Sequence, residues 1–218
     1  MGHKANPLAV RLINKKNWES KWFANRRNFG RILVEDVLIR RLVEKIVGHV
    51  GAIAKIIIER QGEMTTVNIH TGRPGVLIGR SGQATIELKK KIETEFNLKP
   101  VNIKINIIEV KNPNLSAILL AKEVAGQLSR RLHYRRVGKK TIDKAVAAGA
   151  KGIRLILAGR LGGAEIARTE KFQQGSIPAS TFRQDIDFAR VDAKTTYGTI
   201  GIKVYLYQGE KGEKNVNA

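Results

Sequence analysis

Residues 75–82 read GVLIGRSG, and they lie between Pro74 and a helix-like segment at 84–96, ATIELKKKIETEF. Gly79 and Gly82 enclose Arg80 and Ser81 in a G-x-x-G motif. Because glycine has no Cβ, a ligand can approach the main chain closely at both positions. The first N–H groups of the following helix are unsatisfied donors at its positive end. The motif therefore predicts a loop that holds an anion, either a nucleotide or a strand of nucleic acid.

The nucleotide alternative is a P-loop, G-x-x-x-x-G-K-[ST], which also stands between a strand and a helix. Ser81 falls at the position of the magnesium ligand, but Pro74 replaces the first glycine and has no N–H to offer a phosphate oxygen. Arg80 replaces the lysine, and no later apolar strand ends in an Asp suited to hold magnesium. We therefore expect a clamp on a sugar–phosphate backbone, with no small-molecule substrate and no nucleotide cofactor.

The segments around the loop predict a small α+β unit over residues 36–110. A helix is expected from Asp36, as N-cap, to Val47, and a second one runs to about Asn97. Strands are expected at 55–60, 64–71 and 101–107. The last of these, VNIKINI, alternates apolar and polar residues, which is typical of a half-buried strand.

Residues 111–208 predict a second unit, in which two helices precede a sheet. The first helix places Leu128 and Leu132 inward, and the second covers about 139–149. Strands are expected at 153–159, 164–172, 182–191 and 199–207. The polar tail, 209–218, is expected to be mobile.

The first 35 residues predict a basic arm without a long helix. Four aromatic residues, Trp18, Trp22, Phe23 and Phe29, alternate with cations in this arm. They suit stacking on bases, or they pack on the next domain, and the sequence leaves both interpretations open.

The composition points to a polyanionic partner. The 218 residues carry 40 Lys and Arg against 19 Asp and Glu, a formal charge of +21. Such an excess repels itself in a compact chain unless phosphates lie against it, so nucleic acid is the expected partner. There is no cysteine, and the four histidines are scattered, so neither disulfides nor a zinc site is expected. No apolar stretch predicts a membrane span or a signal peptide, so we expect a soluble intracellular protein.

A second cationic cluster lies at 126–140, GQLSRRLHYRRVGKK, which contains no acid. With Leu128 and Leu132 inward, most of its cations face outward. A solvated face is the ordinary interpretation, but in so basic a chain we favour contact with nucleic acid. The cluster consists of Arg130, Arg131, Arg135, Arg136, Lys139 and Lys140.

Paired carboxylates elsewhere do not predict catalysis. Asp185 and Asp187 share a strand face, but Arg183 and Arg190 stand beside them, so surface ion pairs are expected. The turn AGRLGGAEIAR (158–168) has neither the spacing nor the helix start of a dinucleotide site, and its Arg160 and Arg168 either contact RNA or are solvated.

Two resemblances follow from these motifs. Residues 36–110 resemble a type II KH domain, in which the GxxG loop clamps about four nucleotides. The segments MGHKANPLAVRL, GRPGVLIGRSG, AKGIRLILAGRLGGAEIARTEKFQQGSIP and TTYGTIGIKV together resemble the bacterial family of small-subunit ribosomal protein three, over essentially the whole chain. Many relatives carry two basic residues inside the GxxG loop, and here Ser81 replaces one of them.

The resemblance implies an α+β fold, in which a KH domain with a three-stranded sheet and helices on one face precedes two helices on a mainly antiparallel four-stranded sheet. It implies a structural, non-enzymatic role in the head of the cytoplasmic 30S subunit, with 16S ribosomal RNA and mRNA as partners. The neighbours would be ribosomal proteins ten, fourteen and two, and four and five near the mRNA entrance. A free KH protein that escorts RNA is the main alternative.

The resemblance also implies roles for single residues. The GxxG loop would bind RNA through Gly79, Arg80, Ser81 and Gly82. Incoming message would be held and unpaired by Arg131, Arg135, Arg136, Lys139 and Lys140. Ribosomal RNA would be contacted by Lys4, Arg11, Lys15, Lys16, Arg26, Arg27, Arg160 and Arg168.

Overall fold

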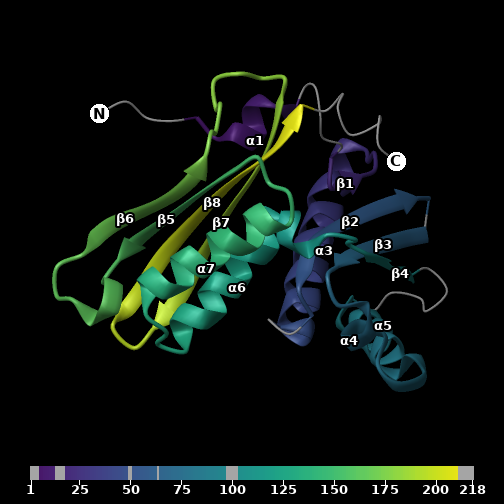
Figure 1. Cartoon of the computed structure of the whole chain (residues 1–218). Helices are drawn as coiled ribbons and strands as arrows, with labels where there is room; N and C mark the ends of the chain where they lie inside the picture. The colour runs from purple at the N-terminus through teal and green to yellow at the C-terminus, as the bar shows by residue number, and fades with distance from the viewer. Residues whose placement is uncertain (1–4, 13–17, 49–50, 63, 97–102, 211–218) are drawn as a thin grey trace. The chain divides into compact units, whose positions relative to one another are not determined.

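The computed structural model describes residues 5–12, 18–48, 51–62, 64–96 and 103–210 (Figure 1). The chain forms two compact units, which we call the central unit, Asn17–Lys111, and the terminal unit, Met1–Lys16 with Asn112–Ala218. The predicted arm is thus divided, because its first residues belong to the terminal unit and the rest to the central unit. The predicted contacts Lys4, Lys15 and Lys16, and most of the predicted tail, lie outside the described residues.

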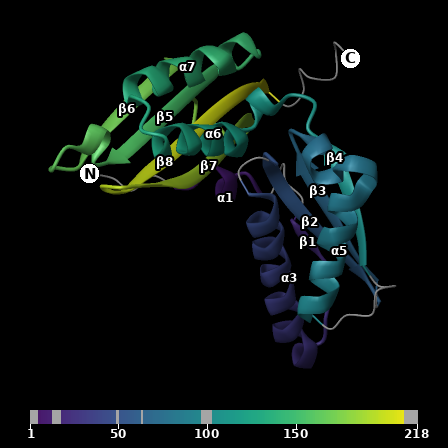
Figure 2. The same cartoon turned by 90° about the horizontal axis from the view of Figure 1, so that it is seen from below.

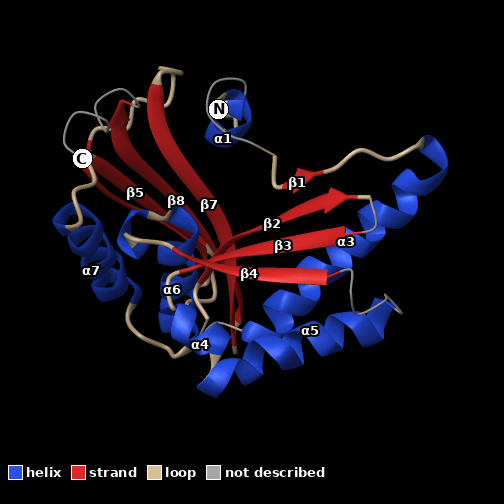
Figure 3. Ribbon diagram, turned by 90° about the vertical axis from the view of Figure 1, so that its right-hand side faces the viewer, coloured by secondary structure: helices blue, strands red, loops and turns tan. Residues whose placement is uncertain are grey.

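The central unit is a four-stranded mixed sheet with helices on one face (Figure 3). The sheet order is β1-β2-β3-β4, where β2 and β3 are antiparallel and the two outer pairs are parallel. The elements are β1 (Ser20–Lys21), α3 (Arg26–Val47), β2 (Ile53–Gln61), β3 (Met64–Thr71), α4 (Pro74–Ile78), α5 (Gln83–Phe96) and β4 (Ile103–Glu109). The predicted three strands are confirmed, and β1 adds a short edge strand.

Side-chain periodicity explains how this unit closes its core. Along β3 every second residue is buried, as the pleat requires when one face of a sheet is covered. On the helices the buried residues recur four apart, Ile39 and Val43 on α3 and Leu88 and Ile92 on α5. These two stripes meet the buried face of the strands in one apolar cluster.

The start of α3 differs from the prediction. The helix begins at Arg26, after the extended residue Asn25, so Asp36 lies in its middle and is not an N-cap. The Asp36 carboxylate is buried and accepts hydrogen bonds from the Trp22 indole (2.7 Å), the Ser20 hydroxyl (3.1 Å) and the Arg60 guanidinium (2.6 and 3.0 Å). Since its partners come from distant segments and not from helix N–H groups, this aspartate marks no helix boundary.

The terminal unit places two helices on one face of an antiparallel sheet, as predicted (Figures 1 and 2). The sheet order is β6-β5-β8-β7. The elements are α1 (Pro7–Val10), α6 (Ala117–Ser129), α7 (Tyr134–Ala147), β5 (Gly152–Gly159), β6 (Arg168–Gly175), β7 (Gln184–Thr195) and β8 (Gly198–Glu210). Leu120, Val124 and Leu128 of α6 pack on the alternating apolar residues of the strands.

Three local predictions for this unit were wrong. The first helix ends at Ser129, so Leu132 lies in the following turn and is 48% exposed instead of inward. The second helix starts at Tyr134, because the His133 side chain caps it by accepting from the Arg135 N–H. Residues 164–167 form a turn, and β6 begins at Arg168.

Asp187 has a structural role that the sequence did not predict. Its carboxylate accepts hydrogen bonds from the Ala117 N–H (2.9 Å) and the Phe188 N–H (3.0 Å). Because Ala117 is the first residue of α6, this carboxylate satisfies a donor at the positive end of the helix.

Candidate nucleic-acid interface

The GxxG loop connects α4 to α5 and exposes its two central residues. Gly79, Ser81 and Gly82 all have positive φ angles, 67°, 53° and 77°. A Cβ on Gly79 would meet the Cβ of Ala84 at 2.8 Å, so α5 approaches the loop too closely for any side chain there. Arg80 and Ser81 are exposed, so a bound strand would meet main chain flanked by one cation.

This geometry differs from that of a P-loop. A P-loop leads directly from a strand into one helix, whereas here Pro74–Ile78 form the separate helix α4 before the loop. The Thr85 hydroxyl donates to the carbonyl of Leu77 (3.1 Å), which ties α5 to α4 across the motif. The loop is therefore a turn between two helices, as the clamp interpretation requires.

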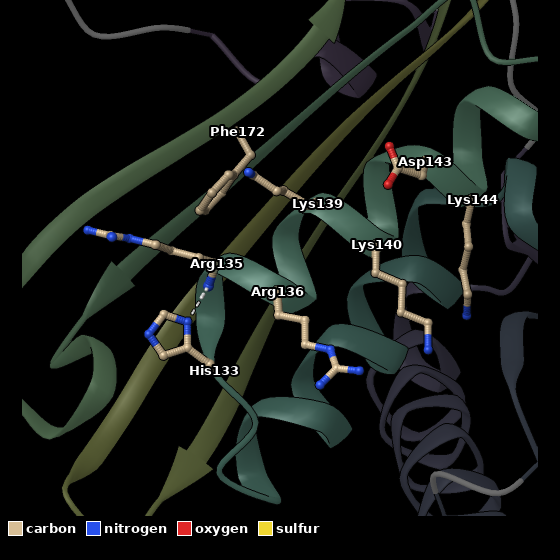
Figure 4. A pocket seen from close by; sticks show the side chains of 8 residues that line it. All are labelled: His133, Arg135, Arg136, Lys139, Lys140, Asp143, Lys144 and Phe172. Carbon is tan, nitrogen blue, oxygen red and sulfur yellow. Dashed lines mark hydrogen bonds between the residues drawn. The ribbon is translucent and has the colours of Figure 1, made fainter.

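The cationic cluster resolves into two rows along α7. Residues four apart lie on the same side of a helix, with Cβ atoms about 5–6 Å apart. Lys139 extends toward Phe172 of β6 and Arg135 lies on the same side of the helix, whereas Arg136 and Lys140 extend away from Phe172 (Figure 4). All four cations are exposed, and none of them pairs with a carboxylate within the described part of the chain. We call these four residues the cation face.

An open hollow of about 700 Å³ lies over this helix. Besides the cation face it is lined by residues that the sequence did not single out: His133, Asp143, Lys144 and Phe172 (Figure 4). The same four-residue spacing from Lys140 would have found Lys144, which forms an ion pair with Glu123. Phe172 could not be found this way, because it reaches α7 from β6. A Cβ on Gly138 would meet its ring at 2.9 Å, so α7 packs directly against it.

The turn before α7 carries the other cations of the cluster. Arg130 and Arg131 are exposed, and Arg131 has a positive φ of 62°. Arg131 is therefore close to the cation face in sequence, but it lies on a turn and not on the helix.

The residues predicted to contact ribosomal RNA fall into two groups. Arg26 and Arg27 are exposed in the first turn of α3, and Arg168 is exposed on β6. Arg160 instead ties its own turn together, because its guanidinium donates to the carbonyls of Ala164 (2.9 Å) and Tyr197 (3.3 Å) and lies over the Tyr197 ring.

Arg11 is buried, at 1% exposure, and its donors are used inside the terminal unit. They reach the carbonyls of Pro7, Ala179, Thr181 and Gln184 at 2.8–3.1 Å. Burial lowers the pKa of this guanidinium, and the carboxylate of Asp185 acts in the opposite direction. Arg11 therefore fastens α1 to the loop before β7, with its side chain buried inside the unit.

The described residues give no sign of a metal centre. They contain no group of three or more His, Cys, Asp or Glu able to hold an ion. His70, on β3, has a lowered pKa because burial disfavours its charged form and Lys55 lies nearby. Nor does the described part contain a helix with the length and apolar content needed to cross a bilayer.

Comparison with known proteins finds a family model that matches part of each unit. Residues 38–115 match the model of the KH domain, and residues 124–206 match the model described as ribosomal protein S3, C-terminal domain. Relatives named small ribosomal subunit protein uS3 align over nearly the whole chain. The one from Clostridium novyi is 49% identical (96% of this chain, 94% of the relative), and that from Parvibaculum lavamentivorans is 46% identical (96% and 87%). The one from Dinoroseobacter shibae is 44% identical (100% and 89%). With a KH domain carrying a GxxG loop in one unit and the cation face in the other, the chain belongs to the uS3 family of small ribosomal subunit proteins.

Proposed function

We propose that this protein, a structural and non-enzymatic constituent of the cytoplasmic 30S subunit, binds 16S ribosomal RNA and helps to form the mRNA entrance. Membership of the uS3 family supports the ribosomal role. The neighbours that we propose are ribosomal proteins ten, fourteen and two in the head, and four and five near the entrance.

The observation that carries the message-binding role is the cation face of α7. This helix carries five cations and one acid, and four of the cations project into solvent without a carboxylate partner among the described residues. An exposed row of this kind attracts phosphates by releasing their counterions, and it requires no particular base sequence. Such a surface can hold any message, as a decoding particle must.

Unpairing would follow from preferential binding. A single strand exposes bases that are paired and stacked inside a duplex. A surface that binds the single strand more tightly than the duplex therefore favours the open state of a hairpin. The open hollow beside Phe172 gives unpaired bases a place next to the cations. No nucleotide hydrolysis by this chain is required.

The test is a charge reversal in ribosomes assembled with the full-length variant. Arg135→Glu, Arg136→Glu and Lys139→Glu together should slow translation through a stable hairpin several-fold and leave an unstructured message unchanged. The matched control reverses three exposed cations of β7 and β8, Arg190, Lys194 and Lys203, which changes the net charge equally. Equal rates on hairpin and unstructured messages in the α7 variant would refute the message-binding role.

The GxxG loop is proposed to hold a segment of RNA through its main chain. Arg80→Asp should weaken binding of single-stranded RNA, and Ser81→Lys should strengthen it, because each changes the exposed charge at the loop. If neither variant changes the affinity, the loop is not a principal contact.

A further inference from the structure

Tyr134 connects two arginines that come from different elements. It is the first residue of α7 and is 4% exposed, with its ring in the core of the terminal unit. Its hydroxyl accepts a hydrogen bond from Arg135 Nε at 3.1 Å and another from Arg168 Nη2 at 3.3 Å. Both guanidiniums also lie over the ring, with Cζ 5.6 and 5.8 Å from its centroid.

These contacts hold two full positive charges close together. Arg135 Nε and Arg168 Nη2 both donate to the hydroxyl oxygen of Tyr134, so this one atom bridges the two guanidiniums. Neither guanidinium pairs with a carboxylate in the part of the chain that the structure describes. Two such charges repel each other, so the arrangement lacks a counterion.

The surroundings increase this need for an anion. Arg135 lies in the first turn of α7, which contains no acid, although the positive end of a helix disfavours cations. The Tyr134 ring alone would pack as well without its hydroxyl, so packing does not explain why the oxygen meets both arginines. An accepting phenol oxygen still has its own proton to donate, and no acceptor for that proton lies among the described hydrogen bonds.

We propose that Tyr134 is a positioning residue that holds Arg135 and Arg168 together as one binding site for a single RNA phosphate. Charge-assisted hydrogen bonds of about 2.8 Å let both guanidiniums reach oxygens of the same phosphate group. Guanidiniums suit this role because their planar donors match phosphate oxygens and stay charged. The proposal rests on the message-binding function of the cation face, and it moves Arg168 from the ribosomal RNA contacts to the message.

The experiment measures how tightly the purified full-length protein binds a fluorescein-labelled oligouridine at a series of salt concentrations. Each phosphate that the protein neutralises on a single strand contributes about 0.7 to the slope of log affinity against log salt. Arg135→Gln with Arg168→Gln should therefore reduce the slope by about 0.7, because the pair shares one phosphate. Each single substitution should weaken binding by some factor. The product of these two factors should exceed the factor for the double variant roughly threefold or more, because the two arginines are coupled.

Tyr134→Phe separates positioning from packing. The ring stays in the core, so far-UV circular dichroism should be unchanged, but the two arginines lose their common anchor. When Tyr134→Phe is also present, the coupling between Arg135→Gln and Arg168→Gln should fall to within about twofold of additive. Coupling that persists without the hydroxyl would overturn the role of Tyr134.

A control distinguishes failure of this inference from failure of the proposed function. Arg136 and Lys140 lie in the other row of α7, so Arg136→Gln with Lys140→Gln should reduce the slope by about 1.4, for two separate phosphates. The inference is wrong if the slope falls by about 1.4 both in the control variant and in the variant with Arg135→Gln and Arg168→Gln. In that case the two arginines bind separate phosphates. If neither pair has an effect on binding, the cation face does not bind RNA and the proposed function itself is wrong.

Discussion

Replacing Asp36 by Ala should destabilise the central unit strongly, because the carboxylate is the common acceptor of a buried polar cluster. The side chain of Asp36 is 2% exposed and that of Arg60 is 11% exposed, and they lie 2.6 Å apart. The substitution would leave the Arg60 guanidinium, the Trp22 indole and the Ser20 hydroxyl without this acceptor. Among the described residues, Arg60 would retain its bond to Glu35, at 2.8 Å.

The expected loss follows from the burial of the pair. Breaking a buried ion pair by removing one partner costs about 3–5 kcal/mol, and the remaining bond from Arg60 to Glu35 favours the lower end, about 3 kcal/mol. In a unit of this size, 1 kcal/mol shifts the melting temperature by about 4–8 °C, so the expected decrease is about 12–24 °C. Native domains have about 5–15 kcal/mol of stability in total, so the variant should fold but marginally.

Tryptophan fluorescence during urea unfolding gives a specific assay. The chain has two tryptophans, Trp18 and Trp22, and both belong to the central unit, so their signal reports this unit alone. The matched control is Glu19→Ala, which removes a carboxylate that is 63% exposed and pairs with Arg40 at 3.4 Å. An exposed pair contributes about 0–1 kcal/mol. If Asp36→Ala costs no more than Glu19→Ala, the buried cluster does not hold the unit together.

Two further predictions use the same fluorescence assay. Gly79→Ala should destabilise the central unit by about 2–3 kcal/mol, because its positive φ with extended ψ suits only glycine and the new Cβ would meet Ala84. Gly82→Ala should cost about 1 kcal/mol, since its positive φ is strained for alanine but the new Cβ would enter open space. Equal costs would contradict the close approach at Gly79. Because the pKa of His70 is lowered in the folded state, the unfolded chain binds a proton first as the pH falls through about 6.5, so the central unit should lose stability as the pH falls below that value. His70→Gln should reduce this loss, and an unchanged pH profile would show that His70 does not contribute to it.

The sequence predicted most of the architecture because the dominant signals are local. Alternation along 64–71 and the four-residue stripe of Leu88 and Ile92 depend on neighbouring residues only. The GxxG motif is local too, since glycine and a following helix are sufficient to recognise it. For these reasons the strands, the turn and the main helices lie within a few residues of the prediction, apart from the starts of α3 and α7.

Sequence patterns missed the role of a side chain where its partners lie in a distant segment. Asp36 has the residue type of an N-cap, but its partners come from residues 20–22 and from Arg60, which no local pattern reveals. The resemblance implies a contact of Arg11 with ribosomal RNA, and the sequence gives no sign that this side chain is buried, because most of its acceptors lie more than 160 residues away in the chain. Tyr134 was not singled out at all, because Arg168 meets it only when β6 packs beside α7.

These cases change how the charge of +21 should be interpreted. The net charge includes every cationic side chain equally. The structure distinguishes the cationic side chains that bond inside the protein from those that have no carboxylate partner among the described residues. Arg11 and Arg60 are buried or nearly so, and their guanidiniums donate to carbonyls and carboxylates inside the protein. The cation face, together with Arg168, keeps its charge exposed and has no carboxylate partner among the described residues. Because counterion release depends on the exposed, unpaired cations alone, the salt dependence of RNA binding should follow this smaller set and not the total charge.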